Sequence, residues 1–415
     1  MSALPALRTG QVLAYGVLGL PLAFAALPLY VYVPRLYAGN LGLSLSVVGA
    51  ILLGARIFDA VTDPVFGWIG DRSGRRGPWM ALAMPALALG MLGLLAPPAS
   101  AGPAWLLVLL VVACAGYSMV SVNYHAWGAE LASGPAERTR VMASREGFGL
   151  LGVVLAAALP TVLGHDEATG LARMAWGFLP LLALAAAVTL TGAPMTSGRG
   201  RGVPLAAMGR VLRRRDFIRL LVLFGLGGMA AAVPASTVLF FIDDVIGRPQ
   251  AAGPLLAVYF MAGAAGLPLW VRLADRLGKV AAWMTSMGLS IAVFAWAFTL
   301  GAGDVVAFGV ICVLSGMALG ADLALPPAIL ADQIGAGGAG AGACFGWWNL
   351  VAKVSLALAA GLALPLLDGL GYAPGADGDS ARRALAGVYA LVPVTLKCLA
   401  LALTWRWRHR LGALR

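Results

Sequence analysis

Apolar segments of about 20 residues follow one another along the whole chain, separated by short charged or Pro/Gly-rich stretches. A helix needs about 20 apolar residues to cross the hydrocarbon core of a bilayer. Only 11% of the residues are charged and 60% are hydrophobic, whereas about a quarter of the residues of an average soluble domain are charged. The sequence therefore excludes a water-soluble fold and predicts an all-α membrane protein.

Twelve such segments can be delimited, and each predicts one transmembrane helix. They lie at 11–35, 44–70, 79–99, 104–128, 144–164, 173–193, 217–242, 251–272, 280–301, 304–331, 343–368 and 383–406. The longest polar stretch separates the sixth segment from the seventh. We therefore expect an N-terminal six-helix bundle (1–195), a cytoplasmic linker (196–216) and a C-terminal six-helix bundle with a short basic tail (217–415).

Most of the 29 Lys and Arg residues fall on one side of the membrane in this arrangement, and most loop acids fall on the other. Cytoplasmic loops carry an excess of Lys and Arg, so this asymmetry places both termini in the cytoplasm. We expect a bacterial inner membrane protein in contact with the lipid bilayer. The net charge of +11 is explained by topology and implies no nucleic-acid partner, because no basic cluster lies on a polar domain with interleaved aromatics.

A short charged motif recurs at the same place in both halves. Its first copy contains Asp71, Arg72, Gly74 and Arg75 after the second segment, and its second copy, 204 residues later, contains Asp275, Arg276, Gly278 and Lys279 after the eighth segment. Two halves related by a parallel repeat are typical of the major facilitator architecture, whose substrate path lies between the halves near the membrane midplane. We expect these residues to form cytoplasmic gating loops rather than to bind ligands.

The second segment contains three ionisable residues, Arg56, Asp59 and Asp63, in the sequence ARIFDAVTDPVFGW. Their i, i+3, i+7 spacing places them on one helix face, with the hydroxyl of Thr62 nearby. The two acids and one base sum to −1, and a charge inside a bilayer requires a partner or a function. The complement is a monovalent cation such as Na⁺, or a proton. The alternative is an inert salt-bridge cluster in which Arg145 or another basic group supplies the missing charge.

Three stretches resemble the glycoside–pentoside–hexuronide:cation symporters, the melibiose-permease family of the major facilitators. They are RIFDAVTDPVFGWIGDRSGRRGPW (56–79), YSMVSVNYHAWGAELASGPAERTRVMASR (117–145) and FGWWNLVAKVSLALAAGLALPLL (345–367). The resemblance implies that Asp59 and Asp63 hold the coupling cation, completed by Thr62 and Ser118. It also implies that Arg145 and Lys353 match the family's helix-five arginine and helix-eleven lysine, facing the central cavity.

The chain departs from the sugar-transporting members of that family at two places. The first segment, 13–34, contains no acid, and the position of the helix-four acid is occupied by Ser121 or Asn123. The resemblance therefore implies retained ion coupling without the family's galactoside-binding acids.

Further polar and aromatic residues are candidates for the substrate cavity, as a polar organic solute would require. They comprise Arg56, Ser121, Asn123, Tyr124, His125, Trp127, Arg145, Asp322, Trp348, Asn349 and Lys353. For His125, an intrahelical hydrogen bond is the alternative. Asp322 has three interpretations: a pair with Lys353, a substrate ligand, or a water-facing position. Lys397 is expected to snorkel to the cytoplasmic surface without a function.

No P-loop, HExxH, GxSxG or paired His/Cys cluster occurs in the sequence, so we predict neither an enzyme nor a cofactor. The sequence favours a monomeric secondary transporter that couples Na⁺ or H⁺ to symport of a small organic solute, such as a sugar or glycoside. The alternatives are a proton-linked exporter of drug-like or amphiphilic substrates, and a membrane assembly partner with the same fold that transports nothing.

Overall fold

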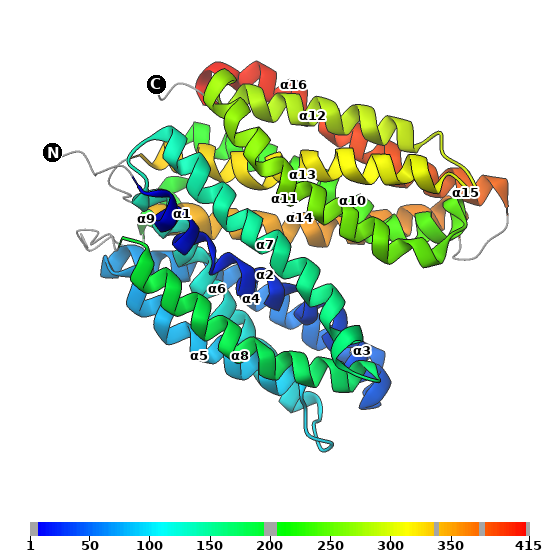
Figure 1. The fold of residues 1–415 in the computed structure, drawn as a ribbon, viewed down its shortest axis with the longest axis horizontal. Coiled ribbons are helices and arrows are strands. Elements are labelled where there is room, and N and C mark those ends of the chain that lie inside the picture. Colours follow the sequence, from blue (N-terminus) through cyan, green and yellow to red (C-terminus); the bar gives the residue numbers. More distant parts are fainter. Residues whose placement is uncertain (1–6, 195–205, 336–339, 373–377, 412–415) are drawn as a thin grey trace. The chain divides into compact units, whose positions relative to one another are not determined.

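The computed structural model describes residues 7–194, 206–335, 340–372 and 378–411, and the regular elements in these ranges are all helices (Figure 1). The chain forms two compact units. Unit 1 contains residues 1–213 and 334–350, and unit 2 contains residues 214–333 and 351–415. The boundaries expected for the two bundles and the linker remain predictions.

The first predicted segment is not one regular helix. It is divided into α1 (Thr9–Gly16) and α2 (Gly19–Leu27), followed by a π-helical turn at Pro28–Tyr32 and the short α3 (Val33–Arg35). Proline lacks the backbone N–H that would bond four residues back. Pro21 therefore leaves the Val17 carbonyl without its α-helical donor, and the N–H of Leu20 bonds to it instead at 3.1 Å.

The other helices of unit 1 match the predicted segments but begin or end several residues away from the predicted limits. They are α4 (Leu45–Ser73), α5 (Arg76–Leu95), α6 (Pro103–Leu131), α7 (Pro135–Leu163), α8 (Glu167–Gly192) and the short α9 (Ala206–Val211). The first turns of α14 (Ala341–Gly369) complete this unit.

The start of α7 corrects the prediction that the fifth segment begins at residue 144. The helix begins at Pro135, so Arg138 and Arg140 lie within it and not in a loop. Proline is favoured at the first helical position because its missing N–H would be unpaired there in any case. Glu137 in the first turn also suits the positive end of the helix dipole.

Small residues let the helices of unit 1 approach closely. A Cβ atom on Gly116 of α6 would lie 2.6 Å from the backbone nitrogen of Leu87 in α5, and one on Gly152 of α7 would lie 2.2 Å from the carbonyl oxygen of Leu20 in α2. Glycine at such crossings is typical of membrane helices, where close van der Waals packing replaces hydrophobic burial as the driving force.

Unit 2 is built from long helices around its own apolar core. Its helices are α10 (Arg215–Phe240), α11 (Ala252–Leu277), α12 (Lys279–Ala297), α13 (Val305–Ile334), the remainder of α14, α15 (Asp379–Ala386) and α16 (Val392–Leu411). Phe241 stacks on Tyr389 with ring centroids 4.2 Å apart, and Phe308 packs against Phe241 at 5.4 Å.

Both units expose many large apolar side chains. Within the described residues, ten helical segments are long and apolar enough to cross a membrane; α4 and α14 are each 29 residues long as well. Large side chains such as Leu82, Val162 and Val306 are 70%, 77% and 83% exposed. Such surfaces suit contact with acyl chains, and the protein is an integral membrane protein.

Candidate functional site

The two acids of the second segment are buried one turn apart in α4. Asp59 is 2% exposed and Asp63 is fully buried. The Ser118 hydroxyl of α6, also fully buried, donates a hydrogen bond to the Oδ1 atom of Asp59. Carboxylate and hydroxyl oxygens from two helices therefore lie together inside unit 1, and such oxygens are the ligands that hard cations prefer. The assignment of Asp59, Asp63 and Ser118 to a coupling-cation site remains a prediction.

The neighbours of these acids on α4 are less buried. The Thr62 hydroxyl donates to the backbone carbonyl of Asp59 at 3.2 Å, so its hydrogen is used within the helix. Arg56 is half-buried one turn before Asp59. Two assignments remain predictions: Thr62 to the coupling-cation site and Arg56 to the substrate cavity.

The first turns of α14 cross α4 immediately after Asp63. A Cβ atom on Gly67 would lie 1.9 Å from the Gly342 carbonyl oxygen, and one on Gly342 would lie 2.0 Å from the Gly67 carbonyl oxygen. A Cβ atom on Gly346 would lie 2.6 Å from the Cα atom of Pro64. The backbones of the two helices are in contact at this crossing, so it has no room for a side chain.

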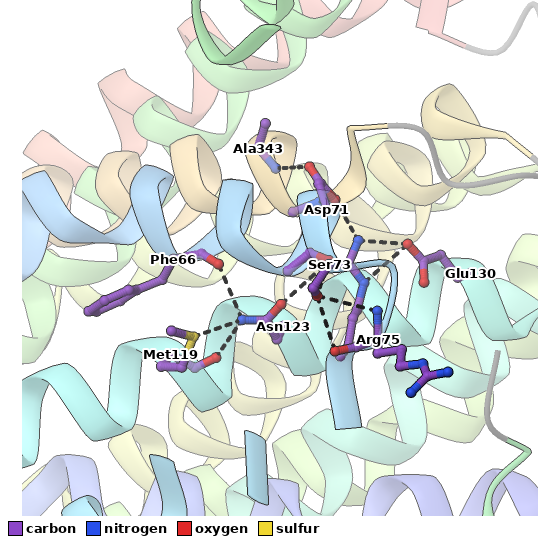
Figure 2. Close-up of polar contacts among 11 residues, drawn as sticks. Phe66, Asp71, Ser73, Arg75, Met119, Asn123, Glu130 and Ala343 are labelled. Atoms are coloured by element: carbon purple, nitrogen blue, oxygen red, sulfur yellow. Dashed lines mark hydrogen bonds and ion pairs between the residues drawn. The ribbon is translucent and has the colours of Figure 1, made fainter. Parts of the chain in front are cut away.

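Asp71 holds the start of α14 against α4. Its Oδ1 atom accepts the backbone N–H of Gly342 at 2.8 Å, and its Oδ2 atom accepts the N–H of Ala343 at 2.9 Å (Figure 2). The first N–H groups of a helix have no partner inside the helix and carry a partial positive charge. A carboxylate at this position satisfies both properties.

Arg76 at the start of α5 joins this carboxylate to α6. Its guanidinium donates to Asp71 Oδ1 at 2.6 Å, to Glu130 Oε1 at 2.6 Å and to the Asn123 side-chain oxygen at 3.1 Å. Asn123 in turn donates to the carbonyls of Met119 at 2.9 Å and Phe66 at 3.3 Å (Figure 2). Both ends of the Asn123 amide are used in this network, and the assignment of Asn123 to the substrate cavity remains a prediction.

The other residues of the first charged motif lie in the last turn of α4 and in the turn that follows it. Gly74 has the positive φ of 65° that favours glycine. Arg72 and Arg75 are exposed, and the Arg72 guanidinium lies 5.3 Å from the centre of the Trp68 ring. Arg76, just outside the motif, is therefore the arginine that connects the helix ends.

The second motif has a comparable ion pair in unit 2. Gly278 has a φ of 86°, and Lys279 contacts Asp332 at the end of α13 at 2.6 Å. Asp275 and Arg276 are exposed. The two places share one feature: the first residue of the following helix is basic, Arg76 in α5 and Lys279 in α12, and it pairs with an acid near the end of the helix after that, Glu130 in α6 or Asp332 in α13. A gating role remains a prediction.

Tyr124 of α6 is bound reciprocally to Tyr15 of α1. The Tyr15 hydroxyl donates to the Tyr124 carbonyl at 2.9 Å, and the Tyr124 hydroxyl donates to the Tyr15 carbonyl. Both side chains are fully buried, and their ring centroids are 4.5 Å apart. These bonds fasten α1 to α6.

His125 and Trp127 of the fourth segment also bond to the protein itself. The His125 Nδ1 atom lies 3.0 Å from the Ser121 carbonyl in the same helix, and its ring stacks on Phe345 of α14 at 5.3 Å. Trp127 donates to the Pro194 carbonyl at 3.3 Å. The intrahelical alternative for His125 thus agrees with the geometry. The assignments of Ser121, Tyr124, His125 and Trp127 to the cavity remain predictions.

Arg145 pairs with the adjacent Glu146 in α7. Its guanidinium also lies 5.6 Å from the centre of the Tyr124 ring. The side chains of Arg145 and Glu146 are 13% and 17% exposed. Because Glu146 balances its charge, Arg145 is a poor candidate for the base that would make the two α4 acids an inert cluster.

Asp322 of α13 binds two groups within unit 2. Lys397 of α16 contacts its Oδ2 atom at 2.5 Å, and the Trp283 indole donates to its Oδ1 atom at 2.9 Å. The Lys397 side chain is 5% exposed, so the prediction that it snorkels to the surface is wrong. The acid within reach draws this lysine inward.

The residues predicted on the eleventh segment follow one another along α14. Trp348 and Asn349 are 4% and 8% exposed and belong to unit 1, and Lys353 is half-buried in unit 2. Their roles in the cavity remain predictions. Sequence reasoning missed Arg76, Glu130 and Lys397 as partners. The one sequence signal for these contacts was the position of a charged residue, at the end of an apolar segment for Arg76 and Glu130 and within one for Lys397.

The helical fold is shared with known transporters. The structure matches a bacterial homologue of the iron transporter ferroportin in an outward-facing state with a TM-score of 0.71 and 17% identity, over 97% of this chain and 100% of that one. It matches FucP, a transporter of the Major Facilitator Superfamily, in the outward conformation with a TM-score of 0.70 and 13% identity, over 94% and 97%. These likenesses define the class as a major facilitator fold.

The family model for MFS/sugar transport proteins matches residues 13–409, and the chain belongs to this family. Sequence relatives include the inner membrane symporter YicJ of Escherichia coli, 24% identical over 63% of this chain and 60% of that protein. The isoprimeverose transporter of Lactiplantibacillus pentosus is 28% identical over 36% and 33%, and an uncharacterized symporter of Synechocystis is 31% identical over 35% and 29%. Each match spans less than two thirds of the relative's length.

Proposed function

We propose that this protein is a secondary transporter that couples Na⁺ or H⁺ to the symport of a small organic solute. The observation that carries the proposal is the pair of buried carboxylates on α4, with the Ser118 hydroxyl bonded to Asp59. Three sequence relatives are named as symporters or as a sugar transporter, which supports both the coupling and the class of solute. A saccharide such as isoprimeverose is the first solute to test.

The coupling follows from the cost of burying charge. Two carboxylates inside an apolar bundle are expensive to keep ionised, and a bound cation lowers that cost. If the cation stabilises the state that binds the solute, linkage requires the solute to strengthen cation binding by the same factor. The gradient of the cation then drives accumulation of the solute by alternating access.

Uptake into proteoliposomes under an imposed Na⁺ or H⁺ gradient tests this function. Asp59→Asn and Asp63→Asn should each abolish accumulation while leaving the protein folded and inserted. Asp304→Asn is the matched control, because Asp304 is an exposed acid at the start of α13, far along the chain from the site. Undiminished accumulation by both α4 variants would overturn the proposal.

The coupling ion can be assigned with a thermal-shift screen of saccharides with and without Na⁺ at two pH values. Sodium coupling predicts that Na⁺ raises the melting temperature of wild type and enlarges the further rise that a bound solute causes. Neither effect should occur in Asp59→Asn. Proton coupling predicts a dependence on pH that Na⁺ leaves unchanged.

A second candidate is the export of drug-like or amphiphilic compounds. It is favoured by the fourth segment, where the polar groups of Asn123, Tyr124, His125 and Trp127 already bond to the protein. A solute with many hydroxyls would have to displace those bonds. Vesicles loaded with solute, under gradients of either direction, separate export from uptake.

Residence in a bacterial inner membrane with both termini in the cytoplasm, as a monomer, is part of the same proposal. The inner-membrane symporter among the relatives supports the location. The excess of Lys and Arg on one side of the predicted helices supports the orientation.

A further inference from the structure

We propose that one end of unit 2 binds the headgroup of an anionic phospholipid. The site is formed by six arginines at the start of α10 and the end of α16, which we name the α10–α16 arginine cluster. Its members are Arg214, Arg215, Arg219, Arg406, Arg408 and Arg410.

The two helix ends lie together because α10 and α16 pack along each other in opposite directions. The Arg219 guanidinium near the start of α10 lies 5.9 Å from the centre of the Trp407 ring near the end of α16. At the other end of the pair, Phe241 stacks on Tyr389. Arg215, one turn before Arg219, therefore lies at the level of the last turn of α16.

The cluster carries a large excess of positive charge. Among the described residues, Asp216 is the acid that forms an ion pair with the cluster, and it pairs with Arg219 at 2.6 Å. Gln333 of α13 bonds to the Asp216 backbone, and the adjacent Asp332 is engaged by Lys279. Arg214, Arg215, Arg406, Arg408 and Arg410 are all exposed. Each guanidinium can donate two parallel hydrogen bonds to a phosphate.

Aromatic side chains place the cluster at the edge of the bilayer. Trp405 is 58% exposed, and the Arg408 guanidinium lies 4.9 Å from the centre of its ring. Exposed tryptophans at the ends of transmembrane helices sit at the level of the lipid headgroups. A basic cluster at this depth, next to apolar helix surfaces, is suited to anionic lipids.

Native mass spectrometry of the purified full-length protein, titrated with phosphatidylglycerol or phosphatidylcholine, tests the site. Wild type should bind phosphatidylglycerol about tenfold or more tightly than phosphatidylcholine, because each basic residue contributes about fivefold. Arg406→Gln/Arg408→Gln should lose most of this preference. Arg248→Gln/Arg383→Gln is the matched control: it removes two exposed arginines elsewhere in unit 2 and should retain the preference.

Three outcomes would overturn the proposal: equal binding of the two lipids by wild type, an unchanged preference in Arg406→Gln/Arg408→Gln, or loss of the preference in the control as well. Competition by glycerol 1-phosphate as strong as that by the lipid would assign the cluster to soluble phosphates instead, and would also overturn it. If the double variant fails to fold, Arg410→Gln at the end of α16 should by itself weaken phosphatidylglycerol binding about fivefold; unchanged binding there counts against the site.

Discussion

Lys397 and Asp322 form an ion pair inside unit 2, between the second turn of α16 and the middle of α13. Removing one member of a buried pair leaves the other charge uncompensated, which costs about 3–5 kcal/mol. Asp322 is 18% exposed, so we expect Lys397→Met to lower the free energy of unfolding by an amount near the lower end, about 3 kcal/mol. Denaturant unfolding in detergent measures this loss.

A double variant separates the charge from the packing. Lys397→Met/Asp322→Asn removes both charges and keeps an oxygen for the Trp283 indole, so it should regain most of the lost stability. A double variant as unstable as Lys397→Met would contradict the ion-pair interpretation, and a stable Lys397→Met would do the same.

Arg76 should not tolerate replacement by lysine. Its planar guanidinium contacts Asp71, Glu130 and Asn123 at once, whereas a lysine ammonium cannot match the geometry of that fork. We expect Arg76→Lys to destabilise the protein by about 1–3 kcal/mol, the cost of a buried polar group that loses its partner. Arg75→Lys, at the exposed neighbour, should change stability by less than about 0.5 kcal/mol. Equal losses in the two variants would show that the network contributes nothing specific.

The crossing of α4 and α14 should be sensitive to a single methyl group. In Gly342→Ala the new Cβ would lie 2.0 Å from the Gly67 carbonyl oxygen, and such overpacking costs about 1–3 kcal/mol. Gly369→Ala, in the last turn of the same helix and with open space around it, should gain about 0.5–1 kcal/mol from helix propensity. Thermal unfolding of both variants measures the difference, and a Gly342→Ala protein as stable as Gly369→Ala would refute the close contact.

The start of α8 should depend on pH. The backbone N–H of Thr169 donates to Asp166 at 2.8 Å, its hydroxyl donates at 2.8 Å, and these bonds hold the pKa of Asp166 below its ordinary value of 3.8. A depressed pKa means that the cap stabilises the helix above pH 4 and that this stabilisation is lost as the pH falls through the lowered value. Hydrogen exchange of the Thr169 amide should therefore accelerate below pH 4 after correction for intrinsic rates. In Asp166→Asn the protection should not titrate; an identical pH response there would exclude Asp166 as its source.

Apolar length was sufficient to predict the order of the long membrane helices, because the thickness of the bilayer sets how long each helix must be. The orientation expected from the charge asymmetry stays a prediction. The ends were harder to place. Arg138 and Arg140 were expected in a loop but lie in α7, since Pro135 and Glu137 favour an earlier start. The break between α1 and α2 arises because Pro21 leaves the Val17 carbonyl without its α-helical donor. Hydropathy alone does not reveal such a break.

Part of the candidate site could be predicted because charged residues stand out in apolar segments. Asp59 and Asp63 are conspicuous because acids within an apolar helix are rare, and their burial agrees with that reading. Other partners are far apart in sequence: Gly342, whose backbone N–H bonds to Asp71, lies 271 residues from it, and Lys397 lies 75 residues from Asp322. Such pairs depend on how the helices pack, which periodicity does not specify.

The bond between Ser118 and Asp59 limits what this hydroxyl can offer to anything that arrives beside it. A serine has one hydrogen and two lone pairs, and here the hydrogen points at the carboxylate. Towards an incoming species the oxygen therefore acts as an electron-pair donor, which suits a metal cation. If Asp59 instead took up a proton, the carboxylic acid could become the donor and the serine hydrogen would be released to turn elsewhere. With sodium bound, Ser118 would thus be the hydrogen-bond donor to Asp59, and with a proton bound, Asp59 would be the donor. The carboxyl stretching region of an isotope-edited infrared spectrum distinguishes the two states.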